Sequence, residues 1–184
     1  MMTQEKPASE SPEGFTLRHD LRPGDLGMIV YLHGTIYARE YGFDPTFEAY
    51  VAGPLAELVR RRTERERLWI AERGGRIAGC IAVVAASDAE AQIRWYLVEP
   101  SARGLGLGKL LLNEALGFCR ICGYASIFLW TVSALKAAAC LYRAVGFVLV
   151  EEKPGRQWGQ DVVEEKYALD LTAEASSPQV SPGL

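Results

Sequence analysis

Residues 97–112 decide the fold, and they read Leu-Val-Glu-Pro-Ser-Ala-Arg-Gly-Leu-Gly-Leu-Gly-Lys-Leu-Leu-Leu. An apolar strand ends at Pro100, and glycines on alternate positions across residues 104–108 lead directly into an apolar helix. Glycines let the backbone approach a ligand closely, and the unpaired N–H groups at a helix N-terminus attract an anion. Arg103 and Lys109 add positive charge at the same place. The stretch therefore predicts a loop that binds phosphate or pyrophosphate.

Two common nucleotide-binding patterns do not fit this loop. A Walker A sequence requires Ser or Thr after its lysine and a glycine six positions before it, where this chain has Leu110 and Arg103. A dinucleotide fingerprint requires G-x-G-x-x-G and an acidic residue about 20 positions later. These glycines run G-x-G-x-G, and no acidic residue lies around Ala125. Both readings are excluded.

The composition indicates an ordinary globular protein. Of the 184 residues, 49% are hydrophobic and 23% are charged, which excludes disordered and membrane-spanning classes. The net charge of −3 gives no reason to expect a nucleic-acid partner, and we interpret the basic run at 60–67 as a solvated helix end. Residues 1–13 lack the apolar segment of a signal peptide, which predicts a cytoplasmic protein with no membrane partner. Residues 14–171 are predicted to form one domain between tails at 1–13 and 172–184.

Hydrophobic periodicity and turn residues predict a mixed α/β sheet in the order β-αα-βββ-α-β-α-ββ. The helix at 44–59 is expected to kink or divide at Gly53-Pro54, the strand at 127–132 to be buried on both faces, and Ser133 to cap the last helix. The expected elements are strand 15–18, helices 24–40 and 44–59, strands 68–71, 77–86 and 92–99, helix 106–122, strand 127–132, helix 133–145, strand 147–151, a loop at 154–160 and strand 162–171.

The cysteines do not form a recognisable metal motif. Cys119 and Cys122 are spaced as C-x-x-C, but a structural zinc site needs further Cys or His ligands at suitable spacing. The chain has only two histidines, His19 and His33. We therefore expect reduced thiols and no metal.

A second motif, Leu-Tyr-Arg-Ala-Val-Gly-Phe at 141–147, follows the Arg-x-x-Gly-x-Gly of the loop at a fixed distance. Together with the order of elements from 15 to 171, these motifs resemble the GNAT superfamily of acyl-CoA-dependent N-acyltransferases. Residues 33–44 also resemble the acetyltransferase half of bacterial proteins that fuse a MarR-type regulator to a GNAT domain. The resemblance implies a GNAT-like sheet whose central strand pair is splayed apart.

The resemblance also implies acetyl-CoA as cosubstrate. Its pyrophosphate would be held by Arg103, Gly104, Leu105, Gly106, Leu107, Gly108 and Lys109. Its pantetheine arm would bind the backbone of Leu97 and Val98 as an added strand, and the N–H near Val98 would polarise the thioester carbonyl. Many relatives have Asn where this chain has Leu135, so either one hydrogen bond to the arm is lost or Ser133 supplies it.

For catalysis, the resemblance implies direct attack by a free amine, with Tyr142 as the acid that protonates the leaving thiolate. The general base stays open, because Gln92 stands where some relatives have a carboxylate. His33, Tyr37 and Glu40 share a helix face, and Glu40 either binds or deprotonates the amine or is solvated surface. Trp158 either walls the same acceptor pocket or packs for stability.

The resemblance thus implies an acetyl-CoA-dependent N-acetyltransferase that acts on a primary amine of a small molecule or a protein. A non-catalytic acyl-CoA-binding regulatory module is the alternative, and a DNA-associated regulator is a weaker third reading. Because many relatives dimerise, a homodimer stays open as well.

Overall fold

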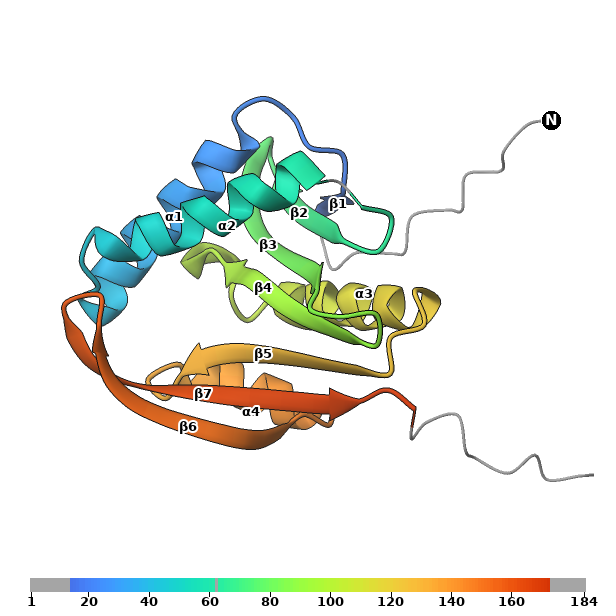
Figure 1. The fold of residues 1–184 in the computed structure, drawn as a ribbon. Helices are drawn as coiled ribbons and strands as arrows, with labels where there is room; N and C mark the ends of the chain where they lie inside the picture. The colour runs from blue at the N-terminus through green and yellow to red at the C-terminus, as the bar shows by residue number, and fades with distance from the viewer. Residues whose placement is uncertain (1–13, 62, 173–184) are drawn as a thin grey trace, which may run out of the picture.

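The computed structural model describes residues 14–61 and 63–172. Over these residues the chain forms a seven-stranded mixed sheet in the order β1-β2-β3-β4-β5-β7-β6 (Figure 1). The elements are β1 (Thr16–Arg18), α1 (Asp25–Tyr41), α2 (Thr46–Arg61), β2 (Arg67–Arg73), β3 (Arg76–Ala85), β4 (Glu90–Val98), the 3-10 helix η1 (Pro100–Ala102), α3 (Leu107–Ile121), β5 (Ser126–Val132), α4 (Lys136–Ala144), β6 (Val148–Gln157) and β7 (Gln160–Asp170). The predicted mixed α/β order is confirmed.

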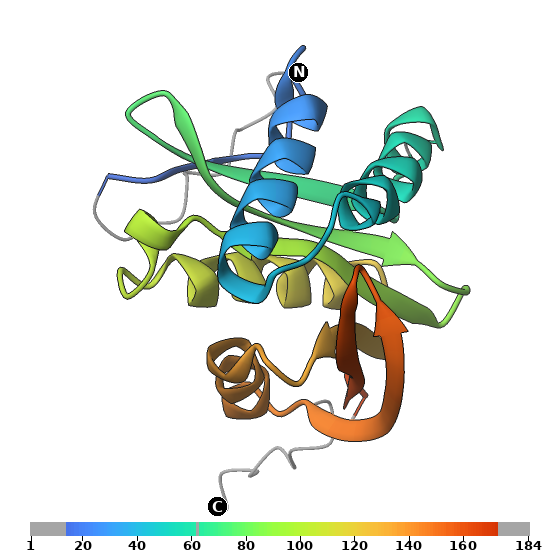
Figure 2. The same ribbon diagram turned by 90° about the vertical axis from the view of Figure 1, so that its left-hand side faces the viewer.

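The helices cover the two faces of the sheet unequally. Helices α1 and α2 lie over one face of β2, β3 and β4, while α3 lies on the opposite face, and α4 packs beside the β5-β7-β6 part (Figures 1 and 2). Two hydrophobic clusters result. One lies around α3 and includes Ile81, Leu111 and Leu129. The other joins α1 and α2 to the sheet and includes Ile29 and Leu55.

The sheet opens between β4 and β5. These two parallel strands pair only from Glu90 with Ser126 to Ile93 with Leu129. Beyond this point β4 contains a bulge, because Cys80 faces Leu97 while Ala82 faces Arg94, and Trp95 adopts a positive φ of 47°. A bulge bends the strand that carries it. The predicted splayed central pair is therefore present.

Two local expectations about helices need correction. Of the kink or division expected at Gly53-Pro54, the division does not occur: α2 is a single helix through Pro54, and buried side chains on both sides of the proline, Val51 and Leu55 among them, hold it in the core. Helix α4 begins at Lys136 with Leu135 as the N-cap residue and no side-chain cap. Ser133 instead lies in the turn after β5, where its N–H donates to the carbonyl of Val163.

Strand β5 was expected to be buried on both faces, and it is buried on one. Ile127 and Leu129 point into the core, whereas the alternate side chains lie on a face where lysines cover them. The ammonium of Lys166 lies 4.3 Å from the ring centroid of Phe128, and that of Lys153 lies 4.6 Å from the ring centroid of Trp130. Cation–π contacts from two lysines thus cover the rings on this face of the strand.

Residues 154–160 form a strand and a tight turn rather than a loop. Strand β6 continues to Gln157, and the turn residues Trp158 and Gly159 have φ of 50° and 75°. Two consecutive residues with positive φ are typical of a type I′ hairpin, whose twist matches that of the strands it joins. The long β6–β7 hairpin curves toward the α1–α2 turn (Figure 1).

Candidate active site

The glycine loop begins where β4 ends. The Glu99 side chain accepts a hydrogen bond from the N–H of Ser101 and caps η1. The chain then turns through Gly104 and Gly106, which have φ of 76° and 80°. Left-handed backbone of this kind strains residues that carry a side chain. Gly106 is the N-cap of α3. Because of the turn at 104–106, the first residues of this helix lie beside the end of β4, where Gly108 is close to Tyr96 and Val98.

The start of α3 presents free backbone donors. Within residues 14–61 and 63–172, the N–H groups of residues 104–109 donate no hydrogen bond. The Tyr96 hydroxyl donates to the Gly108 carbonyl at 2.8 Å, and a Cβ on Gly108 would lie 2.9 Å from that hydroxyl oxygen. Lys109 is exposed beside these donors. The arrangement is a positively charged, solvent-accessible anion site.

Arg103 turns away from this anion site toward α1. Its Nε donates to the Val98 carbonyl at 3.2 Å, and its Nη1 forms an ion pair of 3.0 Å with Oε2 of Glu40. Glu40 is therefore occupied by the loop, and it does not line the cavity described below. His33, Tyr37 and Glu40 were expected to share one face of α1 beside the acceptor pocket. His33 and Tyr37 line the cavity, whereas Glu40 does not.

Backbone groups of Val98 face the gap between β4 and β5. The N–H of Glu99 donates to the Ala78 carbonyl of β3 at 2.8 Å. Successive residues of a strand direct their backbone groups to opposite edges, so those of Val98 point away from β3, and those of Leu97 point back to its partner Cys80. Of the two residues predicted to bind a pantetheine arm through the backbone, only Val98 presents its groups to the gap.

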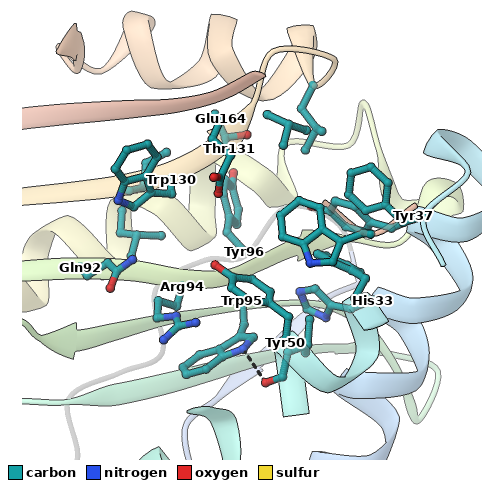
Figure 3. A pocket seen from close by; sticks show the side chains of 18 of the residues that line it. His33, Tyr37, Tyr50, Gln92, Arg94, Trp95, Tyr96, Trp130, Thr131 and Glu164 are labelled. Atoms are coloured by element: carbon teal, nitrogen blue, oxygen red, sulfur yellow. Dashed lines mark hydrogen bonds between the residues drawn. The ribbon is translucent and has the colours of Figure 1, made fainter. Parts of the chain in front are cut away.

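A cavity of about 110 Å³ lies where the two strands part (Figure 3). Its walls are mainly aromatic, with Tyr37, Phe43, Phe47, Tyr50 and Trp158 on the side of α1 and α2. Its polar lining comes from both strands and from β7. In Figure 3, Arg94 lies near Trp95 and Tyr50, while Trp130, Thr131 and Glu164 lie on the other side.

Trp158 reaches this cavity because the β6–β7 hairpin docks on the α1–α2 turn. The Trp158 carbonyl accepts from the N–H of Asp44 at 2.9 Å, and Nε2 of Gln160 donates to the Gly42 carbonyl at 3.0 Å. The indole packs against Phe43 and Phe47 with centroid distances of 4.9 and 5.0 Å. The hairpin thereby closes one side of the cavity. Trp158 both packs against the aromatic cluster and forms part of the cavity wall.

Tyr142 lies on α4 and lines the same cavity. Its ring is held among Tyr96, Phe147 and Tyr167 at centroid distances of 5.7 to 6.1 Å. Its hydroxyl makes no hydrogen bond with the described residues, and because no buried polar side-chain atom there lacks a partner, the hydroxyl oxygen lies at the surface of the cavity. Burial raises the pKa of Tyr142 well above its usual value, so the phenol keeps its proton at neutral pH and is available as a donor.

His33 is buried and neutral. Burial lowers the pKa of His33 to about 4. Its Nδ1 lies 2.8 Å from the Ile29 carbonyl, and a carbonyl only accepts, so Nδ1 carries the proton and Nε2 is left as an acceptor. His33 is a polar wall of the cavity, and it is a weak base at neutral pH.

Comparison with known proteins agrees with this geometry. The pattern of the acetyltransferase (GNAT) family matches residues 31–147. An uncharacterised N-acetyltransferase of Schizosaccharomyces pombe is 32% identical over 149 residues, which cover 79% of this chain and 87% of the relative. The chain belongs to the GNAT acetyltransferase family.

Solved structures show the same GNAT fold. A Salmonella typhimurium protein solved with its cofactor acetyl-CoA has a TM-score of 0.70 at 19% identity, covering 93% of this chain and 99% of that one. Spermidine N-acetyltransferase from Vibrio cholerae, solved with CoA and spermine, has a TM-score of 0.67 at 21% identity, covering 86% of this chain and 96% of that one.

Sequence reasoning about this acetyltransferase missed two charged residues of the cavity, Arg94 and Glu164. Arg94 reads as an ordinary polar position in an alternating strand, and Glu164 lies in a run of charged residues in β7. The bulge in β4 and the length of the β6–β7 hairpin bring them together, and neither is visible in the pattern of residue types. Strand alternation places Gln92, which the sequence did single out, on the same side as Arg94.

Within the described residues, no group of three or more His, Cys, Asp or Glu side chains is arranged to hold a metal ion. No helix in the same residues is both long and apolar enough to cross a membrane.

Proposed function

We propose that this GNAT protein transfers the acetyl group of acetyl-CoA to a primary amine by direct attack. The carrying observation is that β4 and β5 part beside free backbone N–H groups, at the start of α3 and at Val98, next to the cavity that Tyr142 lines. The donors at residues 104–109 and the charge of Lys109 fit a pyrophosphate. When bound, acetyl-CoA supplies the thioester whose acetyl group is transferred.

Three groups around the gap act in different steps of the reaction. The N–H of Val98 stabilises the negative charge that develops on the thioester carbonyl oxygen as the amine adds. The hydroxyl of Tyr142 donates its proton to the departing thiolate. Glu164 is the one carboxylate that lines the cavity in the described residues, so it takes the proton from the amine, directly or through water. Glu40, paired with Arg103, holds the loop instead.

The test is release of free thiol when the purified chain is mixed with acetyl-CoA and a panel of amines. We expect thiol release that depends on the amine and equals the amount of N-acetylated product. Absence of transfer to every amine, with acetyl-CoA still bound, would instead support a non-catalytic acyl-CoA-binding module. That second candidate is favoured by Leu135 at the position where many relatives bind the arm through Asn and by Gln92 in place of a carboxylate.

A further inference from the structure

Two consecutive side chains of β4 enter the same cavity because of the bulge. In a regular strand Arg94 and Trp95 would point to opposite faces. The positive φ of Trp95 and the register shift from Ala82 to Cys80 put both on the side of α1 and α2. There Nε1 of Trp95 donates to the Val51 carbonyl at 3.2 Å (Figure 3), which fixes the indole under the guanidinium.

Arg94 is held by ring faces and not by an acid. Its guanidinium carbon lies 4.7 Å from the ring centroid of Trp95 and 5.8 Å from that of Tyr50. In the part of the chain that the structure describes, these two ring contacts are the interactions found for Arg94, and it forms neither an ion pair nor a side-chain hydrogen bond. Stacking orients the planar fork of donors and leaves it open to a ligand.

The rest of the cavity indicates what that ligand carries. A guanidinium fork matches a carboxylate through two parallel hydrogen bonds. Glu164 lines the same cavity and accepts a hydrogen bond from Gln157, so a cationic amine has a counter-charge there. The walls between these groups are aromatic. The volume of about 110 Å³ is of the order of the roughly 150 Å³ cavity that holds one benzene ring.

We propose that Arg94 binds the carboxylate of the acceptor, and that the acceptors are α-amino acids with an apolar or aromatic side chain. This inference rests on the proposed function and names its substrate class. The neutral α-amine forms the N–C bond to the acetyl carbon, the C–S bond breaks, and the amine loses one proton while the thiolate gains one. The products are an N-acetylamino acid and CoA. A polyamine fits poorly, because its several cations would meet one carboxylate and one free guanidinium.

The first experiment compares phenylalanine with phenethylamine, which lacks only the carboxylate, and with spermidine, by thiol release. We expect wild-type protein to prefer phenylalanine. Arg94→Met should raise KM for phenylalanine by about 10- to 100-fold, the range for losing a charge-assisted hydrogen bond, while kcat/KM for phenethylamine changes by less than about threefold. Arg76→Met, at the exposed first residue of β3, is the matched control and should change neither.

Faster acetylation of phenethylamine or spermidine than of phenylalanine by the wild type would overturn the inference and leave the acetyltransferase intact. An equal loss for both aromatic substrates in Arg94→Met would do the same.

A binding experiment separates this inference from the proposed function. N-acetylphenylalanine is titrated calorimetrically into wild-type and Arg94→Met protein in the presence of CoA. Tighter binding by the wild type supports the carboxylate site even if no amine is acetylated, in which case the proposed function alone fails. Equal binding overturns the carboxylate site whatever the enzyme acetylates.

Discussion

Glu40 at the end of α1 and Arg103 in the glycine loop form an ion pair of 3.0 Å that ties the first helix to the anion site. Because the pair uses the carboxylate outside the cavity, Glu40→Gln should leave kcat within about threefold of wild type, whereas loss of a general base costs about 10²–10⁴-fold. Steady-state kinetics with any accepted amine measures this. A hundredfold fall in kcat would instead show that Glu40 takes part in proton transfer. The side chains of Arg103 and Glu40 are 46% and 21% exposed, respectively, so we expect a stability change below about 1 kcal/mol.

Tyr142→Phe tests the proposed acid. The ring and its packing are retained, and the hydroxyl makes no hydrogen bond in the described residues, so the melting temperature should hardly change. We expect kcat to fall by about 10²–10⁴-fold, with acetyl-CoA affinity similar to wild type. Tyr31→Phe, at a tyrosine that is 60% exposed on α1, is the control. Unchanged kcat in Tyr142→Phe would remove this phenol from the mechanism.

Gly108→Ala tests the close approach of α3 to β4. The new methyl group would lie 2.9 Å from the Tyr96 hydroxyl oxygen, and overpacking of this kind costs about 1–3 kcal/mol. We expect lower stability in denaturant and weaker acetyl-CoA binding. Gly117→Ala, in the same helix with no atom within 4 Å of the added Cβ, should be about 0.5–1 kcal/mol more stable than wild type. Equal effects of the two substitutions would contradict the predicted contact.

The buried His33 predicts a pH dependence of stability. Its pKa is lowered to about 4 in the folded chain from about 6.5 in the unfolded chain. Between these values the unfolded state binds more protons, so this contribution to stability is complete above about pH 6.5 and is lost as the pH falls toward 4.

His33→Gln, which does not titrate, isolates this contribution. The free energy of unfolding of the wild type, relative to that of the variant, should fall by about 1.5 kcal/mol between pH 6.5 and pH 5. Denaturant unfolding at the two pH values measures the difference. Carboxylates with lowered pKa values, such as Asp25, also lose stability in acid, but they do so in both proteins and cancel. A constant difference would show that His33 is accessible to protons in the folded state.

The sequence by itself determined the features that depend on neighbouring residues. The alternate glycines before Leu107 predict a strand, a turn with positive φ and a helix start that binds anions, because conformational freedom and free N–H groups are properties of a few consecutive residues. With the second motif around Tyr142 they were enough for the family and for the splayed sheet. The finer resemblance to regulator fusions and the proposed tails stay predictions.

The tertiary structure decided which side chains share the cavity. Arg94 enters it because one extra residue at Trp95 shifts the register of β4, and Trp158 closes it because β6 and β7 continue to a two-residue turn. Glu40, three residues after Tyr37 on the same helix, is drawn out by Arg103, which is 63 positions away in the chain. Such outcomes depend on contacts between distant segments, and periodicity along the chain carries no information about them.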